Sequence, residues 1–197
     1  MISELINIQF VTAIVSFISI LFYLLLINSA KKQGKHIENP EFLILFALIG
    51  IALSLNRILS SFIPVYNSFV GSVVVNIIIN ILVIVGCISL LLYAYENKKY
   101  FETHFLTGAK LILISHIFAI ATQYINILLS ILGFSVTMIS TIFTINSIIS
   151  EIIFIVAFGF LILHGINKED NSIVTGAFIQ ICLLLLLLTI AIASLFL

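Results

Sequence analysis

The sequence predicts an all-α integral membrane protein, a bundle of six transmembrane helices. Hydrophobic residues make up 62% of the 197 residues and charged residues only 8%, whereas soluble domains carry about 25% charged residues. The mean hydropathy is +1.35. The apolar residues fall in six continuous runs, each at or above the ~20 residues that a helix needs to cross the hydrocarbon core of a bilayer.

The six runs define the spans of a single transmembrane domain over residues 1–197. A spanning segment must satisfy its own backbone hydrogen bonds, so each long run is expected to be a helix rather than a barrel strand. Pro40 precedes the second span and Pro64 follows it, which marks both ends of that span. The first run lacks the basic flank and cleavage site of a secretory signal, so we expect it to be retained. The expected spans are 6–28, 42–63, 69–95, 108–132, 136–164 and 173–197.

The basic residues predict the orientation of the bundle. The connections after the second and fourth spans, 63–68 and 130–135, are short and uncharged. Seven of the eight basic residues lie instead in or beside the other three connections: Lys31, Lys32, Lys35, Lys98, Lys99, Lys110 and Lys168. The positive-inside rule places these lysine-rich loops in the cytoplasm. We therefore expect a multi-pass protein of the cell membrane with both termini outside the cytoplasm.

A short internal repeat accompanies the six spans. The tripeptide Thr-Gly-Ala opens the fourth span at 107–109 and recurs at the start of the sixth span at 175–177, 68 positions later. A unit of two spans keeps its orientation when it is repeated, unlike the inverted repeats of many transporters. This repeat suggests three tandem helical hairpins with a period of about 68 residues. Chance similarity between Ile/Leu-rich spans that end in lysine loops is the other explanation.

Two ionisable residues stand out deep inside the predicted spans. Arg57 belongs to the second span and Glu151 lies near the middle of the fifth. A charge at the centre of a bilayer costs about 2.5–3.5 kcal/mol or more, so such residues mark functional sites by default. The guanidinium of Arg57 is close enough to the outer face to reach the headgroups, and an ion pair with Glu151 would lower the cost of both charges. Glu151 has no such route to water and is the sharper candidate.

Six amide side chains accompany these two residues, and nearly all of them fall in the half of the bilayer away from the lysines. As a group they predict a polar cavity that opens to the extracytoplasmic side. Taken singly, each is better explained by hydrogen bonding between helices, which averages about 0.6 kcal/mol per contact. Both interpretations stay open at this point. The six amides are Asn56, Asn76, Asn80, Gln123, Asn126 and Asn146.

Cys87, His116 and Cys182 form a second, sparser set at similar depth in three different spans. Thiolate and imidazole groups are the ligands that zinc and soft metals prefer. However, no two of these residues share a span, so the sequence contains no ligand spacing of the kind that metal sites show. The sequence therefore predicts no metal site and no cofactor.

Several function classes are excluded by what the sequence contains. The net charge is zero and no basic stripe occurs, so we expect no nucleic-acid partner. Metalloprotease, serine-hydrolase and nucleotide-loop motifs are absent, so we expect no enzyme. Minimal loops and spans without an internal proline lead to a first hypothesis, a non-catalytic structural or accessory subunit of a larger membrane complex, with the lipid bilayer and other membrane subunits as partners. The alternatives are a receptor or sensor and a small-solute or ion transporter, each with an outward-facing polar cavity around Glu151 and Arg57.

Overall fold

The computed structural model describes residues 2–33, 37–62, 69–101 and 103–193, and every regular element in them is an α-helix. All six helices are long and apolar enough to cross a membrane, which confirms the prediction of an all-helical, multi-pass membrane protein. Lys35, the connection 63–68 and the last four positions of the sixth predicted span lie outside the described residues. The helices are α1 (Ile2–Gln33), α2 (Glu41–Phe62), α3 (Phe69–Glu96), α4 (Thr103–Ile131), α5 (Val136–Asn167) and α6 (Asn171–Ala193).

Several helix ends fall at residues that suit them. The Ser135 side chain accepts a hydrogen bond from the backbone N–H of Met138 and so caps the start of α5. Asp170 caps α6, because its Oδ1 accepts hydrogen bonds from the first N–H groups of that helix. Between α4 and α5, Gly133 adopts a left-handed backbone with φ +79, a conformation that costs glycine nothing.

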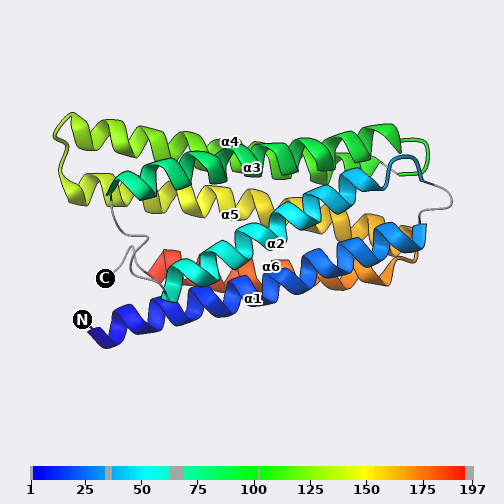
Figure 1. The fold of residues 1–197 in the computed structure, drawn as a ribbon, viewed down its shortest axis with the longest axis horizontal. Coiled ribbons are helices and arrows are strands. Elements are labelled where there is room, and N and C mark those ends of the chain that lie inside the picture. The colour runs from blue at the N-terminus through cyan, green and yellow to red at the C-terminus, as the bar shows by residue number, and fades with distance from the viewer. Residues whose placement is uncertain (1, 34–36, 63–68, 102, 194–197) are drawn as a thin grey trace.

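The six helices form a closed ring. Each helix packs against the next one in sequence, and α6 packs against α1; no other helix pair makes a close backbone contact within the described part of the chain. In Figure 1, α3 and α4 lie along the upper side, α1 and α6 lie along the lower side, and α2 runs diagonally between them. Consecutive helices run in opposite directions, so α1 begins and α6 ends at the same end of the bundle.

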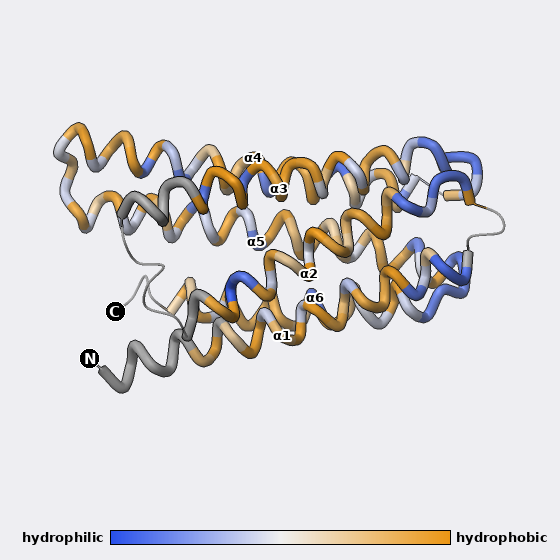
Figure 2. The backbone as a smooth tube through the Cα atoms, in the orientation of Figure 1, coloured by the Kyte–Doolittle hydropathy of each residue, from blue (hydrophilic) through white to orange (hydrophobic). Residues whose placement is uncertain are grey.

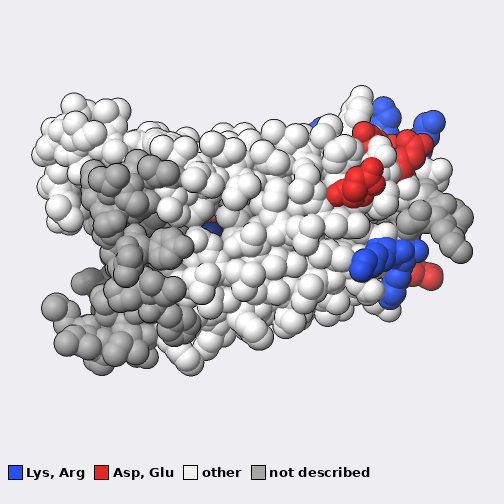
Figure 3. Space-filling model, viewed as in Figure 1, with Lys and Arg blue, Asp and Glu red and all other residues white. Residues whose placement is uncertain are grey.

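Charged side chains gather at one end of this ring, which we call the lysine end. Figure 3 shows Lys, Asp and Glu side chains clustered there, and Figure 2 shows the hydrophilic segments at the same end. The described residues of the α4–α5 connection at the opposite end carry no charge. The uneven distribution of charge along the sequence is therefore a difference between the two ends of the bundle.

The hydrophobic core fills the half of the ring nearest the lysine end, and all six helices contribute to it. The ring of Phe22 on α1 crosses the centre and lies edge-on to Phe158 on α5, with centroids 5.3 Å apart. Small residues let the backbones approach closely, as is usual between membrane helices. At Gly108 on α4, for example, an added Cβ would lie 3.0 Å from the carbonyl oxygen of Ala157 on α5.

Polar contacts close the ring at the lysine end. Ser29 Oγ on α1 donates to Asp170 Oδ2 at 2.5 Å, and Asn28 Nδ2 donates to Ser172 Oγ on α6 at 3.2 Å. The buried side chain of Asn97 joins the end of α3 to the connection that precedes α2. Together with the core, these contacts leave little space at this end of the ring.

Candidate functional site

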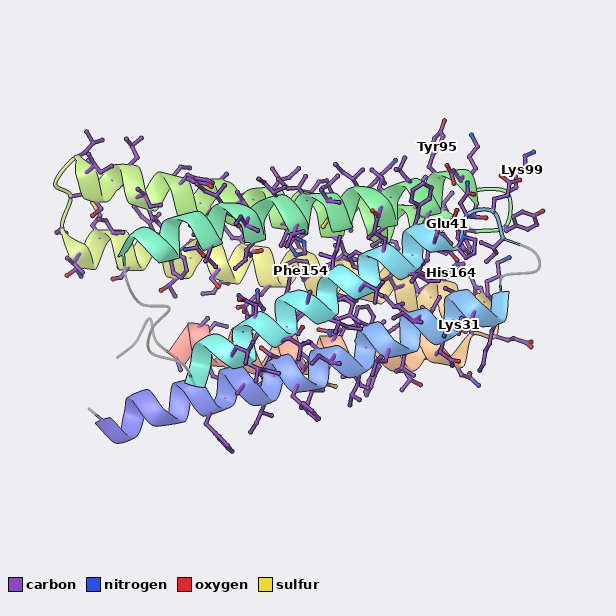
Figure 4. The ribbon with its side chains drawn as sticks, viewed as in Figure 1. Lys31, Glu41, Tyr95, Lys99, Phe154 and His164 are labelled. Atoms are coloured by element: carbon purple, nitrogen blue, oxygen red, sulfur yellow. The ribbon has the colours of Figure 1, made fainter. Side chains whose placement is uncertain are left out.

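The ring contains a partly open cavity that begins where the hydrophobic core ends. Its inner part, which we call the central chamber, measures about 180 Å³ and is lined by residues from all six helices. Its larger part, which we call the wide chamber, measures about 450 Å³ and lies among α2, α4, α5 and α6. The two chambers adjoin because Arg57, Phe154 and Leu184 line both of them. Figure 4 places Phe154 about halfway along the bundle, between its two sides.

The wide chamber lies in the half of the ring away from the lysine end. On α4 it is lined by residues 119–123, which follow the core positions of that helix. On α5 it is lined by residues 143–154, which precede the core positions at Ala157 and Leu161. The core at the lysine end is sealed further by the ring of His164, which lies edge-on to Phe101 with centroids 4.8 Å apart; His164 is labelled near that end in Figure 4. The cavity is thus closed by packed side chains on its lysine-end side.

Four of the eight polar residues singled out by the sequence line the wide chamber together. Arg57 comes from α2, Gln123 from α4, and Asn146 and Glu151 from α5. These positions are far apart in sequence and meet only because the ring closes. The structure therefore brings Arg57 and Glu151 to the walls of one cavity.

The carboxyl group of Glu151 is only half satisfied. Ser147, one turn earlier on α5, donates its hydroxyl to Glu151 Oε1 at 3.3 Å. Glu151 Oε2 is shielded from solvent and has no hydrogen-bond partner among the described residues. A buried acceptor without a partner costs about 1–3 kcal/mol, and more when it is charged. Glu151 therefore has one oxygen left to accept a hydrogen bond from a bound group.

Apolar and aromatic side chains form the remaining walls of the wide chamber, among them Phe143, Phe154 and Leu187. Beside them, α4 and α5 are held together by Ser115 and Ser150, whose hydroxyl oxygens lie 2.8 Å apart. A mainly apolar cavity with a few convergent polar groups is the usual form of a site for a small molecule.

The other four predicted polar residues lie outside the wide chamber. Asn80 on α3 does not line the chamber but contacts a residue that does, because its Nδ2 lies 3.4 Å from Gln123 Oε1. Asn56 lines a separate groove of about 200 Å³ between α2 and α3. Asn76 is exposed on α3. Asn126 has both polar side-chain atoms enclosed, with no hydrogen-bond partner among the described residues.

Two of the three candidate metal ligands meet, and the third does not join them. Cys87 Sγ on α3 lies 3.5 Å from His116 Nδ1 on α4, and the same nitrogen lies 2.9 Å from the carbonyl oxygen of Ile112. Cys182 is exposed on α6. Among the described residues, no three His, Cys, Asp or Glu side chains lie close enough together to hold a metal ion. His116 instead lines the central chamber.

The central chamber also contains polar residues that the sequence reasoning did not single out, namely Tyr23, Ser54 and Gln180. Gln180 could have been found, because it is a buried amide within the sixth predicted span. Tyrosine and serine are too common in membrane helices to give such a signal.

No protein-family model matches the chain, and no curated protein and no solved structure matches it either. What the chain does is therefore inferred from its own residues and their geometry.

Proposed function

We propose that this chain is a non-catalytic membrane protein that binds a small polar solute in the wide chamber, as a receptor, a sensor or a transporter. One observation carries the proposal: Arg57 from α2 and Glu151 from α5 line the same cavity of about 450 Å³. This volume lies within the 300–1,000 Å³ of typical small-molecule pockets. Ionisable residues inside a membrane are costly and commonly mark a solute or ion pathway.

The proposed orientation has both termini outside and the lysine end in the cytoplasm of a cell-membrane protein. It is supported by the clustering of lysines at one end of the bundle and by the positive-inside rule. In this orientation the wide chamber lies in the outer half of the bundle and receives its solute from outside the cell.

Three tandem hairpins, α1–α2, α3–α4 and α5–α6, form the proposed plan of the ring. The two glycines of the repeated tripeptide support it, since each lies at the contact with the following helix. Gly108 on α4 packs against α5, and Gly176 on α6 packs against Phe22 of α1. Each glycine thus lies where its helix packs against the next helix around the ring.

An accessory subunit of a larger membrane complex is the second candidate function. It is favoured by Asn76, whose amide is exposed on α3 within a membrane-spanning segment. A polar side chain on a lipid-facing surface gains most when another helix supplies a hydrogen-bond partner. A neighbouring membrane protein would supply that helix.

The solute proposal is tested by native mass spectrometry of the full chain extracted gently from its membrane. We expect a small molecule to remain bound to the wild-type chain and to be lost from Glu151→Gln. Thr189→Ala is the matched control, because that exposed hydroxyl donates only to a carbonyl of its own helix. A wild-type chain that carries no small molecule, and that is not stabilised against heat by any member of a library of polar metabolites, contradicts the proposal.

The same extraction tests the subunit proposal. A stoichiometric protein partner that is released by Asn76→Ala but retained by Thr189→Ala would support it. A wild-type chain that runs as a monomer or small homo-oligomer would refute it.

A further inference from the structure

We infer that the solute of the wide chamber is a zwitterion, a small molecule that carries one ammonium and one carboxylate group, as free amino acids do. This inference rests on the proposed function and specifies its ligand class. It starts from the charged groups that face the chamber. Among the described residues that line it, Arg57 supplies one positive charge and Glu151 one acidic group.

The two charges select against ligands of a single sign. Charges on the walls of a narrow cavity in a protein interact more strongly than the same charges in bulk solvent. An anion that approaches Arg57 is repelled by Glu151, and a cation that approaches Glu151 is repelled by Arg57. A ligand with one charge of each sign is attracted by both groups and adds no net charge to the interior of a membrane protein, where net charge is costly.

The chemistry of each charged group matches one end of such a ligand. The guanidinium of Arg57 is a planar fork of donors that suits a carboxylate. On the opposite helix, Glu151 Oε2 has no hydrogen-bond partner among the described residues and can accept from an ammonium group. Ser147 donates a hydrogen bond to the other oxygen of the same carboxyl group, Oε1. Oε2 therefore favours a ligand group that donates a hydrogen bond.

The other walls of the chamber suit the remainder of an amino acid. Asn146 and Gln123 supply amide groups for the polar end of the ligand, and Asn80 contacts the Gln123 side chain from α3. Phe143 and Leu187 supply an apolar surface for a side chain. The volume of about 450 Å³ accepts a small molecule and excludes a macromolecule.

The experiment compares three forms of each of the twenty amino acids: the free zwitterion, the cationic carboxamide and the anionic N-acetyl derivative. Binding to the purified full chain in lipid nanodiscs is measured by calorimetry. We expect the wild-type chain to bind at least one free amino acid more than tenfold more tightly than either of its derivatives. Thr189→Ala is expected to keep this order.

Two charge-removing variants test the assignment of each end. Arg57→Gln should remove the preference for a free carboxylate, so that the carboxamide binds at least as tightly as the zwitterion. Glu151→Gln should remove the preference for a free ammonium, so that the N-acetyl derivative binds at least as tightly as the zwitterion. If either variant fails to fold, Arg57→Lys and Glu151→Asp keep each charge and should keep the wild-type order.

The possible results separate this inference from the proposed function. Binding of another polar solute with no binding of any amino acid overturns the inference and leaves the proposed function standing. No bound solute of any kind overturns both. Equal loss of all three forms in both folded variants also overturns the inference, because it removes the match between each charge and one end of the ligand.

Discussion

Asn97 and Glu38 exchange two hydrogen bonds at the lysine end of the bundle. Asn97 Nδ2 donates to the Glu38 carbonyl oxygen at 2.7 Å, and Asn97 Oδ1 accepts from the Glu38 backbone N–H at 2.8 Å. The same Nδ2 also lies 3.0 Å from the carbonyl oxygen of Tyr93, one turn earlier in the chain. With its side chain 0% exposed, Asn97 satisfies the backbone of the connection before α2 and fixes it to the end of α3.

Asn97→Ala should lower the free energy of unfolding by about 1–3 kcal/mol, because it removes both hydrogen bonds to the backbone of Glu38. Unfolding in mixed detergent micelles, followed by circular dichroism, measures the change. Asn39→Gly is the control, since it removes an exposed hydrogen bond to Glu96 Oε2, while glycine adopts the left-handed backbone of this position (φ 52) without strain, and it should cost less than about 1 kcal/mol. Equal stability of the two variants would contradict the role given to Asn97.

Gly176→Ala should destabilise the contact between α6 and α1. A Cβ at Gly176 would lie 2.8 Å from a ring carbon of Phe22, and that ring is fully buried beside Tyr23 and Phe158. Overpacking of this kind costs about 1–3 kcal/mol. Gly159→Ala is the matched control, because nothing lies within 4 Å of its added Cβ, and helix propensity should stabilise that variant by up to about 1 kcal/mol. The midpoint temperature of thermal unfolding should therefore fall in Gly176→Ala and rise in Gly159→Ala.

Asp170→Ala should cost about 2 kcal/mol, since it removes both the cap of α6 and the acceptor for Ser29. Ser29→Ala removes the hydrogen bond between the two side chains but keeps the cap of α6, and it should cost about 1 kcal/mol. The double variant should be more stable than the sum of the two changes predicts, because the shared hydrogen bond is counted twice. Strict additivity in the same unfolding assay would show that the α1–α6 hydrogen bond contributes nothing.

Cysteine labelling should distinguish the cavity from the lipid-facing surface. In a background with Cys87→Ala and Cys182→Ala, Asn146→Cys places a thiol in the wide chamber. A maleimide that cannot cross membranes should label it from the side opposite the lysine end, because the reactive thiolate forms only in contact with water. Ile145→Cys, one residue away, occupies a position 46% exposed on the outside of the bundle and should stay unlabelled in hydrocarbon. Labelling of Asn146→Cys only from the lysine end would overturn the proposed orientation.

The number and approximate limits of the helices could be predicted from the sequence, because hydropathy alone decides which segments enter a bilayer. Residues 42–62 of the second predicted span, 42–63, lie on α2 (Glu41–Phe62), and position 63 is outside the described residues. Polar ends were harder to place: α5 continues to Asn167 and α4 begins at Thr103, beyond the predicted limits at 164 and 108. A helix continues past its apolar segment wherever its ends are capped, and hydropathy does not detect caps.

The make-up of the cavity could be predicted only in part. Depth follows from position in a span, so Arg57, Gln123, Asn146 and Glu151 were grouped from the sequence and do line one cavity. The direction in which a side chain points around its helix depends on which neighbouring helices that helix packs against. Asn76 and Asn80, one turn apart, therefore differ, since Asn76 is exposed and Asn80 contacts Gln123. In a uniformly apolar helix, no amphipathic stripe indicates which face is buried.

The packing of α6 against α1, which closes the ring, has a consequence for the order of assembly. Ser29–Asp170 and Asn28–Ser172 join residues 141 and 144 positions apart, whereas every other helix pairs with its immediate neighbour. In a chain synthesised from its N-terminus, each helix from α2 to α5 can pair with the helix before it as it emerges. The face of α1 that carries Phe22 must wait for α6. Until then the bundle is an open arc whose wide chamber lacks the wall formed by Leu184 and Leu187. The wide chamber is thus the last part of the protein to form, and a chain that ends before α6 has no such chamber.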